Sequence, residues 1–218
     1  MKDVTSYAAS YARAVHGDIE VAASPFTTEE VAELDRTGEL LVYVPAGLSV
    51  HELASRAGIR ANFDFANEQL IRCVMMEEGH WFICAAEKTP ELLYHSAISV
   101  QRIFEDQGLH GMDLRRYLAF CITYRYHHGC FPDQGYWTFL LSGGYDRSGI
   151  SIVGFDRLEV LSHHGWMRNF RAKFVGSRYA ALAPRIEVTH ETAALGRPRR
   201  GKIGSADLEA SVDRLAPD

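Results

Sequence analysis

Long apolar runs without charge are missing from this chain of 218 residues. No segment approaches the roughly 18 uncharged apolar residues that a membrane-spanning helix requires. Residues 1–18 also contain neither the apolar centre nor the cleavage signature of a signal peptide. We therefore expect a soluble, cytoplasmic protein that has no membrane partner.

Paired cysteine spacings are missing as well. The four cysteines are Cys73, Cys84, Cys121 and Cys130, and no two of them form a Cys-x-x-Cys pair. The first three lie in apolar runs, where a cysteine usually behaves as a small buried hydrophobic residue. The cysteine pattern therefore predicts free thiols and a reduced, intracellular protein.

The composition lacks any extreme. Hydrophobic residues make up 47% of the chain and charged residues 23%, which is typical of a globular protein and excludes disorder of the bulk. The length suits one large domain. A net charge of -5 repels phosphate backbones at long range, which argues against a dedicated nucleic-acid-binding protein.

Complete catalytic and phosphate-binding motifs are also lacking. Residues 196–202 match a phosphate-binding loop, but Ile203 stands where the motif needs a hydroxyl to hold magnesium. We interpret this segment as a solvated basic loop. The His-Glu pairs at residues 51–52 and 190–191 lack the second histidine of a zinc-protease motif, so we reject that interpretation.

The chain does contain a clear succession of helical and strand patterns. Apolar spacing, capping boxes and terminal glycines predict helices at residues 4–15, 28–37, 50–57, 89–107 and 112–127. Apolar and β-rich runs predict strands at residues 39–45, 69–76, 81–86, 136–142, 150–155 and 157–163.

This order of elements favours a single-domain α+β fold. The N-terminal half is helix-rich and the C-terminal half is mainly antiparallel sheet, unlike an alternating parallel fold. We expect the domain to span residues 1–184. Residues 185–218 are polar and basic, and we expect them to form a C-terminal extension with a short helix.

The histidines are the most informative side chains. There are ten, and four of them form the doublets His127-His128 and His163-His164. Zinc prefers imidazole and thiolate ligands, so His127, His128 and Cys130 at the end of a predicted helix are candidate metal ligands. The alternative is a set of surface and capping residues, because adjacent side chains point in different directions and histidine stabilises helix C-termini.

Arg125 is the second candidate. At about 100° per residue, it falls on the apolar stripe of Leu114, Leu118 and Cys121, and His128 lies nearby. An inward guanidinium needs a carboxylate, a carbonyl or a bound anion as its partner. The alternative is a side chain with a buried stem and its charged group in water.

A basic and aromatic stretch covers residues 166–179. Its cations are Arg168, Arg171, Lys173 and Arg178, and its aromatic residues are Trp166, Phe170, Phe174 and Tyr179. Such a pattern is compatible with binding of single-stranded nucleic acid. Because no RNA-binding signature accompanies it, we favour an amphipathic segment with its aromatic rings in the core.

Three functions follow from these features. We rank first a non-catalytic domain that binds a small ligand or a protein partner through Arg125, His128, His163 and His164. The alternative is a metal- or histidine-dependent enzyme, with zinc as its candidate metal, that uses these histidines together with His127 and Cys130. A nucleic-acid-binding accessory protein comes third, and a homo-oligomer is compatible with each of the three.

The cysteine pattern makes one direct prediction. Thiol titration of the denatured, unreduced protein should find four reactive thiols, because no disulfide is expected to form in a reducing compartment. A count of two or fewer would contradict both the free thiols and the intracellular location.

Overall fold

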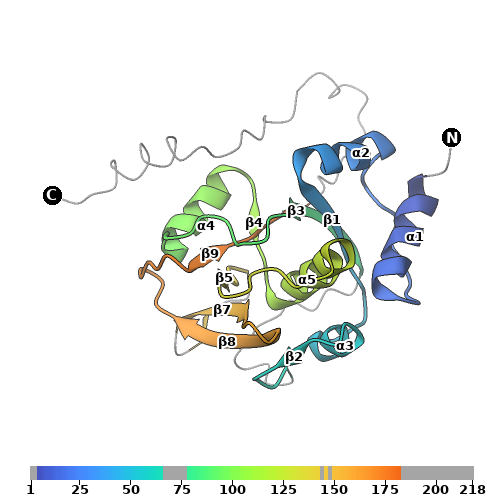
Figure 1. Cartoon of the computed structure of the whole chain (residues 1–218). Coiled ribbons are helices and arrows are strands. Elements are labelled where there is room, and N and C mark those ends of the chain that lie inside the picture. The colour runs from blue at the N-terminus through green and yellow to red at the C-terminus, as the bar shows by residue number, and fades with distance from the viewer. Residues whose placement is uncertain (1–3, 66–77, 143–144, 147–148, 183–218) are drawn as a thin grey trace. The chain divides into compact units, whose positions relative to one another are not determined.

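The computed structural model describes residues 4–65, 78–142, 145–146 and 149–182 (Figure 1). The predicted strand at residues 69–76 and the predicted extension at residues 185–218 lie outside the described residues. Within the described part of the chain, no helix is both long enough and apolar enough to cross a bilayer.

The helices and strands have the following bounds. The helices are α1 (Val4–His16), α2 (Thr28–Thr37), α3 (Val50–Arg56), α4 (Ala97–Asp106) and α5 (Leu114–His128). The strands are β1 (Glu39–Val44), β2 (Arg60–Ala61), β3 (His80–Ala85), β4 (His110–Gly111), β5 (Trp137–Phe139), β6 (Tyr145–Asp146), β7 (Gly149–Phe155), β8 (Val160–Trp166), β9 (Val175–Ser177) and β10 (Tyr179–Leu182).

These strands form two sheets. The first has the order β1-β3-β10-β4 and is antiparallel throughout. The second has the order β2-β8-β7-β5-β9, with β6 beside β7, and its β2–β8 and β5–β9 pairs run parallel. Helices with largely antiparallel sheets confirm the predicted α+β class. The two halves of the chain are nevertheless interleaved, because β10 pairs with β3 and β4 in the first sheet.

β1 is buried on both faces, which explains its unbroken apolar sequence. Successive residues of a strand point to opposite faces of a sheet. Leu40, Val42 and Val44 accordingly lie in the core that contains α5, whereas Leu41 and Tyr43 lie in the core formed with α1 and α2. The strand predicted at residues 39–45 is confirmed.

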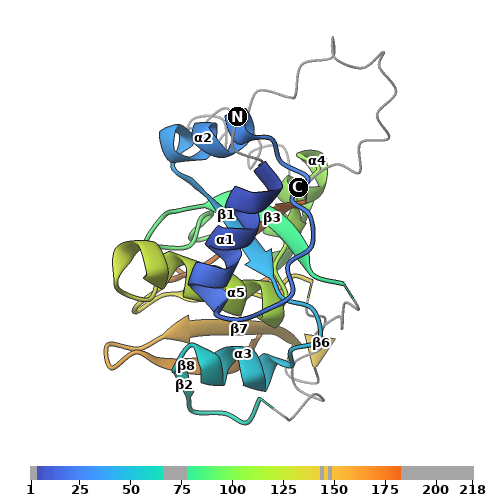
Figure 2. The same ribbon diagram turned by 90° about the vertical axis from the view of Figure 1, so that its right-hand side faces the viewer.

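α5 lies between the two sheets (Figures 1 and 2). One core cluster joins it to Val42 and Phe82 of the first sheet and to Val153 and Phe155 of the second. Its buried residues occur on all sides of the helix, as expected for a helix at the centre of a core. α4 covers the other face of the second sheet. The prediction of a mostly buried helix after residue 112 is confirmed.

Both predicted capping boxes are present. The side chain of Thr27 accepts a hydrogen bond from the Glu30 amide while Glu30 accepts from the Thr27 amide, and Ser49 and Glu52 form the same reciprocal pair. Each box satisfies two amides that the first turn of a helix leaves without a partner.

The predicted start of α4 is wrong. The sequence places it at residues 89–90, but the helix begins at Ala97, with Ser96 as its N-cap. Glu91 instead forms an antiparallel bridge with Ser177, which keeps this segment extended. Gly176 is required there, because a Cβ at this position would collide with the Glu91 carbonyl oxygen.

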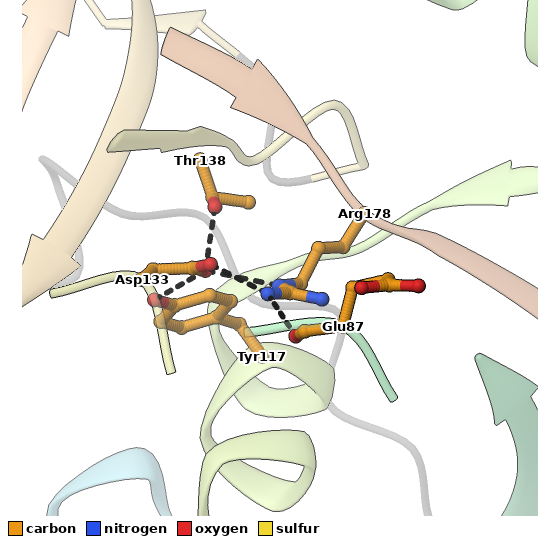
Figure 3. Close-up of polar contacts among 5 residues, drawn as sticks. All are labelled: Glu87, Tyr117, Asp133, Thr138 and Arg178. Atoms are coloured by element: carbon orange, nitrogen blue, oxygen red, sulfur yellow. Dashed lines mark hydrogen bonds and ion pairs between the residues drawn. The ribbon is translucent and has the colours of Figure 1, made fainter. Parts of the chain in front are cut away.

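A buried ion pair connects the two sheets where the chain passes from β9 to β10. Arg178 lies between these strands and is 1% exposed, and Asp133 is fully buried. Arg178 donates from Nε to Asp133 Oδ2 at 3.0 Å and from Nη2 to Oδ1 at 2.6 Å (Figure 3). Nη2 also donates to the Glu87 carbonyl oxygen at 2.9 Å. Two parallel bonds of this kind are the strongest arrangement for an arginine and a carboxylate.

Asp133 extends this pair into a network. Its Oδ2 also accepts hydrogen bonds from Tyr117 Oη at 3.1 Å and from Thr138 Oγ1 at 2.8 Å. The Asp133 amide donates to the Lys88 carbonyl oxygen, and the Arg178 guanidinium lies 4.3 Å from the centre of the Phe120 ring. The network therefore joins α5, β5, the segment after β3 and the β9–β10 junction.

Two cysteines near this network, Cys84 and Cys121, are buried and have weakly acidic thiols. Cys84, Cys121 and Cys130 are free, as predicted, whereas Cys73 lies outside the described residues. Burial raises the pKa of the Cys84 and Cys121 thiols well above the ordinary value, although the charge of Arg178 opposes this effect. Because only the thiolate is nucleophilic, these two buried cysteines are structural residues.

We predict that Asp133→Asn severely destabilises the protein. The substitution leaves the Arg178 charge buried without a counter-charge, so the free energy of unfolding should fall by about 3–5 kcal/mol in urea denaturation. Asparagine tolerates the positive φ of 57° at this position, so the backbone is not the cause.

The exposed pair of Glu33 and Arg36 provides the matched control. Glu33→Gln should change the free energy of unfolding very little, because water replaces the lost contact. Equal losses in Glu33→Gln and Asp133→Asn would contradict a special role for the buried pair.

Candidate functional site

The first histidine doublet lies exposed at the C-terminal end of α5. His127 Nε2 is 2.9 Å from the Tyr11 hydroxyl oxygen, and the His128 ring centre is 4.2 Å from that of Tyr124. The two imidazole centres are 6.3 Å apart. Each ring therefore has its own aromatic or hydroxyl neighbour.

The second doublet is divided between the two faces of β8. His163 Nε2 is 3.1 Å from Ser151 Oγ, and its ring packs near Phe63 at 5.6 Å. His164 is exposed on the other face, with its ring centre 5.0 Å from that of Trp137. Because neighbouring side chains of a strand point in opposite directions, this doublet cannot offer both rings to one ion.

No three His, Cys, Asp or Glu side chains in the described part of the chain form a group that would hold a metal ion. His127, His128 and Cys130 are therefore not arranged as a metal-binding group in the described structure. Zinc binding at this turn stays a prediction.

Of the two orientations that the sequence leaves open for Arg125, the structure shows the exposed one, and His128 is exposed as well. Both side chains are exposed, because the core beneath α5 ends at Tyr124. Arg125 donates from Nη1 to the Ala57 carbonyl oxygen at 3.1 Å, and its guanidinium lies 4.6 Å from the centre of the Phe131 ring. The helical phase was correct, but the last turn of the helix lies outside the core.

A groove between α1, α3 and α5 brings Arg125 together with residues that the sequence analysis did not single out. It consists of two adjoining hollows of about 380 and 390 Å³, which share Val15, Ala57 and Ile122 in their linings. Leu48 and Leu53 extend the apolar lining of the first hollow, and Tyr126 lines the second. These volumes lie at the lower end of the range for small-molecule sites.

His16 is the buried polar side chain of this groove. It is 8% exposed and lines the first hollow, and its Nε2 atom has no hydrogen-bond partner. Burial lowers the pKa of His16 to about 4, although a hydrogen bond to the Tyr43 backbone opposes this effect and the charge of Arg56 adds to it. The ring is therefore neutral at pH 7.

The orientation of the His16 ring follows from the sign of the backbone effect. A bond to the backbone that raises the pKa is one in which the imidazole donates to a carbonyl oxygen, so the hydrogen lies on that side of the ring. The remaining nitrogen, Nε2, then carries a lone pair and accepts hydrogen bonds or a proton.

The charges around the groove have one sign. Arg56 lines the first hollow and Arg125 the second, and among the described residues neither lining includes a carboxylate. This arrangement contrasts with the net charge of -5 for the whole chain. Two guanidinium groups beside an apolar floor provide electrostatic attraction for an anion and apolar contact for its hydrocarbon part.

The sequence analysis missed His16 for a physical reason. A single histidine at the end of an amphipathic helix, followed by Gly17, looks like an ordinary C-terminal cap. Its burial depends on β1 and α3, which approach only in the folded chain. The only local hint that His16 is buried is the apolar residue Val15 immediately before it.

No family model matches the chain, and no curated protein or solved structure is detectably similar to it. The geometry of the site is therefore the basis for the function proposed below.

We predict that His16 makes the protein less stable in mild acid. The unfolded chain takes up a proton near the ordinary histidine pKa of 6.5, whereas the folded protein does so only near pH 4. The stability that neutral His16 contributes is fully present above pH 6.5 and is lost as the pH falls toward 4. At pH 5 the loss in the free energy of unfolding is roughly 2 kcal/mol. His16→Gln should therefore lose that much less stability than the parent between pH 7.5 and pH 5, as measured by urea denaturation.

His110→Gln is the matched control, since His110 is exposed and its ring lies in water in the folded and the unfolded chain alike. It should reproduce the pH dependence of the parent. If His16→Gln does so too, the ring is not buried in its neutral form.

Proposed function

We propose that this protein is a non-catalytic binding domain for a small molecule that carries an apolar body and an anionic group. The ligand would occupy the groove between α1, α3 and α5, with its anionic group near Arg56 and Arg125. We also propose that it acts in the cytoplasm, where the free cysteines stay reduced.

The observation that carries this proposal is the Nε2 atom of His16. Buried polar atoms are nearly always hydrogen-bonded, and one that is left without a partner calls for a specific explanation. Here the atom belongs to a side chain that lines the first hollow of the groove together with Arg56, and Arg125 lines the adjoining hollow. A ligand with a polar group at this point would supply the missing partner.

The apolar lining supports an amphiphilic ligand over an inorganic anion. Val15, Leu48 and Ile122 are partly exposed and offer hydrocarbon surface, whose burial is favourable by roughly 25 cal/mol per Å². An inorganic phosphate would contact the arginines and leave this surface in water. A carboxylate with a short alkyl or aryl body would contact both the arginines and the apolar lining.

Proton uptake should accompany binding. An anion close to the His16 ring favours the imidazolium, so the pKa of His16 rises when the ligand binds. The same anion that satisfies the arginines therefore also turns Nε2 into a hydrogen-bond donor. Binding should strengthen as the pH falls from 8 toward 6.

Octanoate is the probe that tests this function, and octanol is its uncharged counterpart. At ten times its dissociation constant, octanoate should stabilise the protein by about 1.4 kcal/mol, which raises the melting temperature by roughly 3–6 °C.

Arg56→Gln should reduce this shift strongly, and Arg56→Lys should retain much of it. Arg102→Gln, at an exposed arginine of α4, is the control and should respond as the parent does.

Two results would contradict the proposal. The first is an equal shift with octanol, which would mean that only hydrocarbon contact is involved. The second is an unchanged response to octanoate in Arg56→Gln.

Titration calorimetry in buffers of different ionisation enthalpy adds an independent measurement of proton uptake. The proposal requires that the parent takes up protons when octanoate binds and that His16→Gln takes up none.

A further inference from the structure

The segment between β8 and β9 exposes large apolar side chains that the sequence analysis assigned to the core. Met167 is 62% exposed, Phe170 48% and Phe174 46%, and neighbouring Tyr94 is 56% exposed. The expectation that these phenylalanines lie in the core is therefore wrong. Scattered exposed apolar residues are normal, but a group within eight residues of chain is typical of an interaction surface.

These side chains belong to a row of aromatic rings on the second sheet. Trp166 lies 5.5 Å from Phe170 and 6.2 Å from Phe174, measured between ring centres, and both contacts are edge-to-face. The Trp137 amide donates to the Phe174 carbonyl oxygen at 2.8 Å, and the Trp137 ring contacts that of His164 at 5.0 Å. We call these five residues the aromatic row.

Backbone hydrogen bonds hold the exposed part of this row in place. The Tyr94 amide lies within 3.2 Å of the Ala172 carbonyl oxygen, and the Ile98 amide donates to the Arg168 carbonyl oxygen at 3.3 Å. The Phe170 amide donates to the Met167 carbonyl oxygen at 3.1 Å, which closes a turn. The rings are thus presented by an ordered segment, which limits the conformational entropy lost on binding.

The charge of this segment is opposite to that of the chain as a whole. Arg171 and Lys173 are exposed between the two phenylalanines, and Arg168 precedes them. No aspartate or glutamate occurs between residues 160 and 182. The surface therefore complements a negatively charged partner, although the net charge of the protein is -5.

We propose that the aromatic row, together with Arg171 and Lys173, binds single-stranded nucleic acid. Every nucleobase has a flat face that stacks on an aromatic ring, and cations beside the rings contact the phosphates. The alternative partner is an anionic bilayer, for which apolar groups must project together into lipid. Flat rings make up most of this surface and three of them lie on strands of a sheet, so the geometry favours stacking over insertion.

Fluorescence anisotropy with a labelled 20-nucleotide oligouridine tests this proposal. The expected result is binding that weakens with salt, because phosphate contacts release counterions. Phe170→Leu with Phe174→Leu keeps apolar bulk but removes both rings, and should weaken binding by at least roughly five-fold. Arg171→Gln with Lys173→Gln should reduce the slope of log affinity against log salt by about 1.4.

Tyr126→Leu is the matched control, since this aromatic residue is 54% exposed on α5 and lies outside the aromatic row. It should bind oligouridine as the parent does. All variants alter exposed side chains, so each should keep the melting temperature of the parent. Quenching of the Trp137 and Trp166 fluorescence by unlabelled oligouridine gives a second readout.

Vesicles containing phosphatidylserine distinguish the two anionic partners. Binding to these vesicles without binding to oligouridine would overturn the proposal in favour of a membrane surface, and the Phe-to-Leu variant would then retain its affinity. Oligouridine binding that is unchanged in both double variants would also overturn it. The two double variants of the aromatic row and its cations should respond to octanoate as the parent does, since the groove is a separate site.

Discussion

Arg178 is almost completely removed from water, and its charge is balanced by the carboxylate of Asp133, 45 residues earlier in the chain. Arg178 lies between strands of different sheets, and Asp133 receives hydrogen bonds from α5 and β5. The pair therefore specifies how the two sheets and the central helix meet. Purely apolar contacts tolerate small shifts between layers, whereas a bidentate ion pair with two further hydroxyl donors tolerates very few.

The filled centre explains why the candidate binding surfaces lie at the periphery. Apolar side chains pack α5 between the two sheets, and the buried pair of Arg178 and Asp133 lies beside this packing. The groove arises where the last turns of α1 and α5 extend beyond this core and meet α3. The aromatic row lies on β5, β8 and the segment between β8 and β9, at the margin of the core that α4 forms with the second sheet. Both surfaces carry exposed cations on a protein of net charge -5, which is why we propose negatively charged partners for each of them.

Local interactions account for the parts of the fold that the sequence predicted. The capping boxes of α2 and α3 involve residues three positions apart. The unbroken apolar run of β1 indicates a buried strand, whichever segments cover it. The start of α4 was missed because Glu91 pairs with Ser177, far along the chain, and this pairing outweighs the helical signal of a proline at the first turn. β9 and β10 were missed because each is short and is defined by its partners in two different sheets.

By itself, the sequence determined the α+β class, the buried helix after residue 112 and the free state of the described cysteines. Each of these depends on composition or on neighbours within one or two helical turns. Only the tertiary structure decided that the histidine doublets have separate neighbours, that His16 is buried beside Arg56, and that Phe170 and Phe174 face water. The reason is that burial of a side chain depends on which distant segments pack over it, and the positions that lie at the margin of the core are those where local periodicity carries the least information.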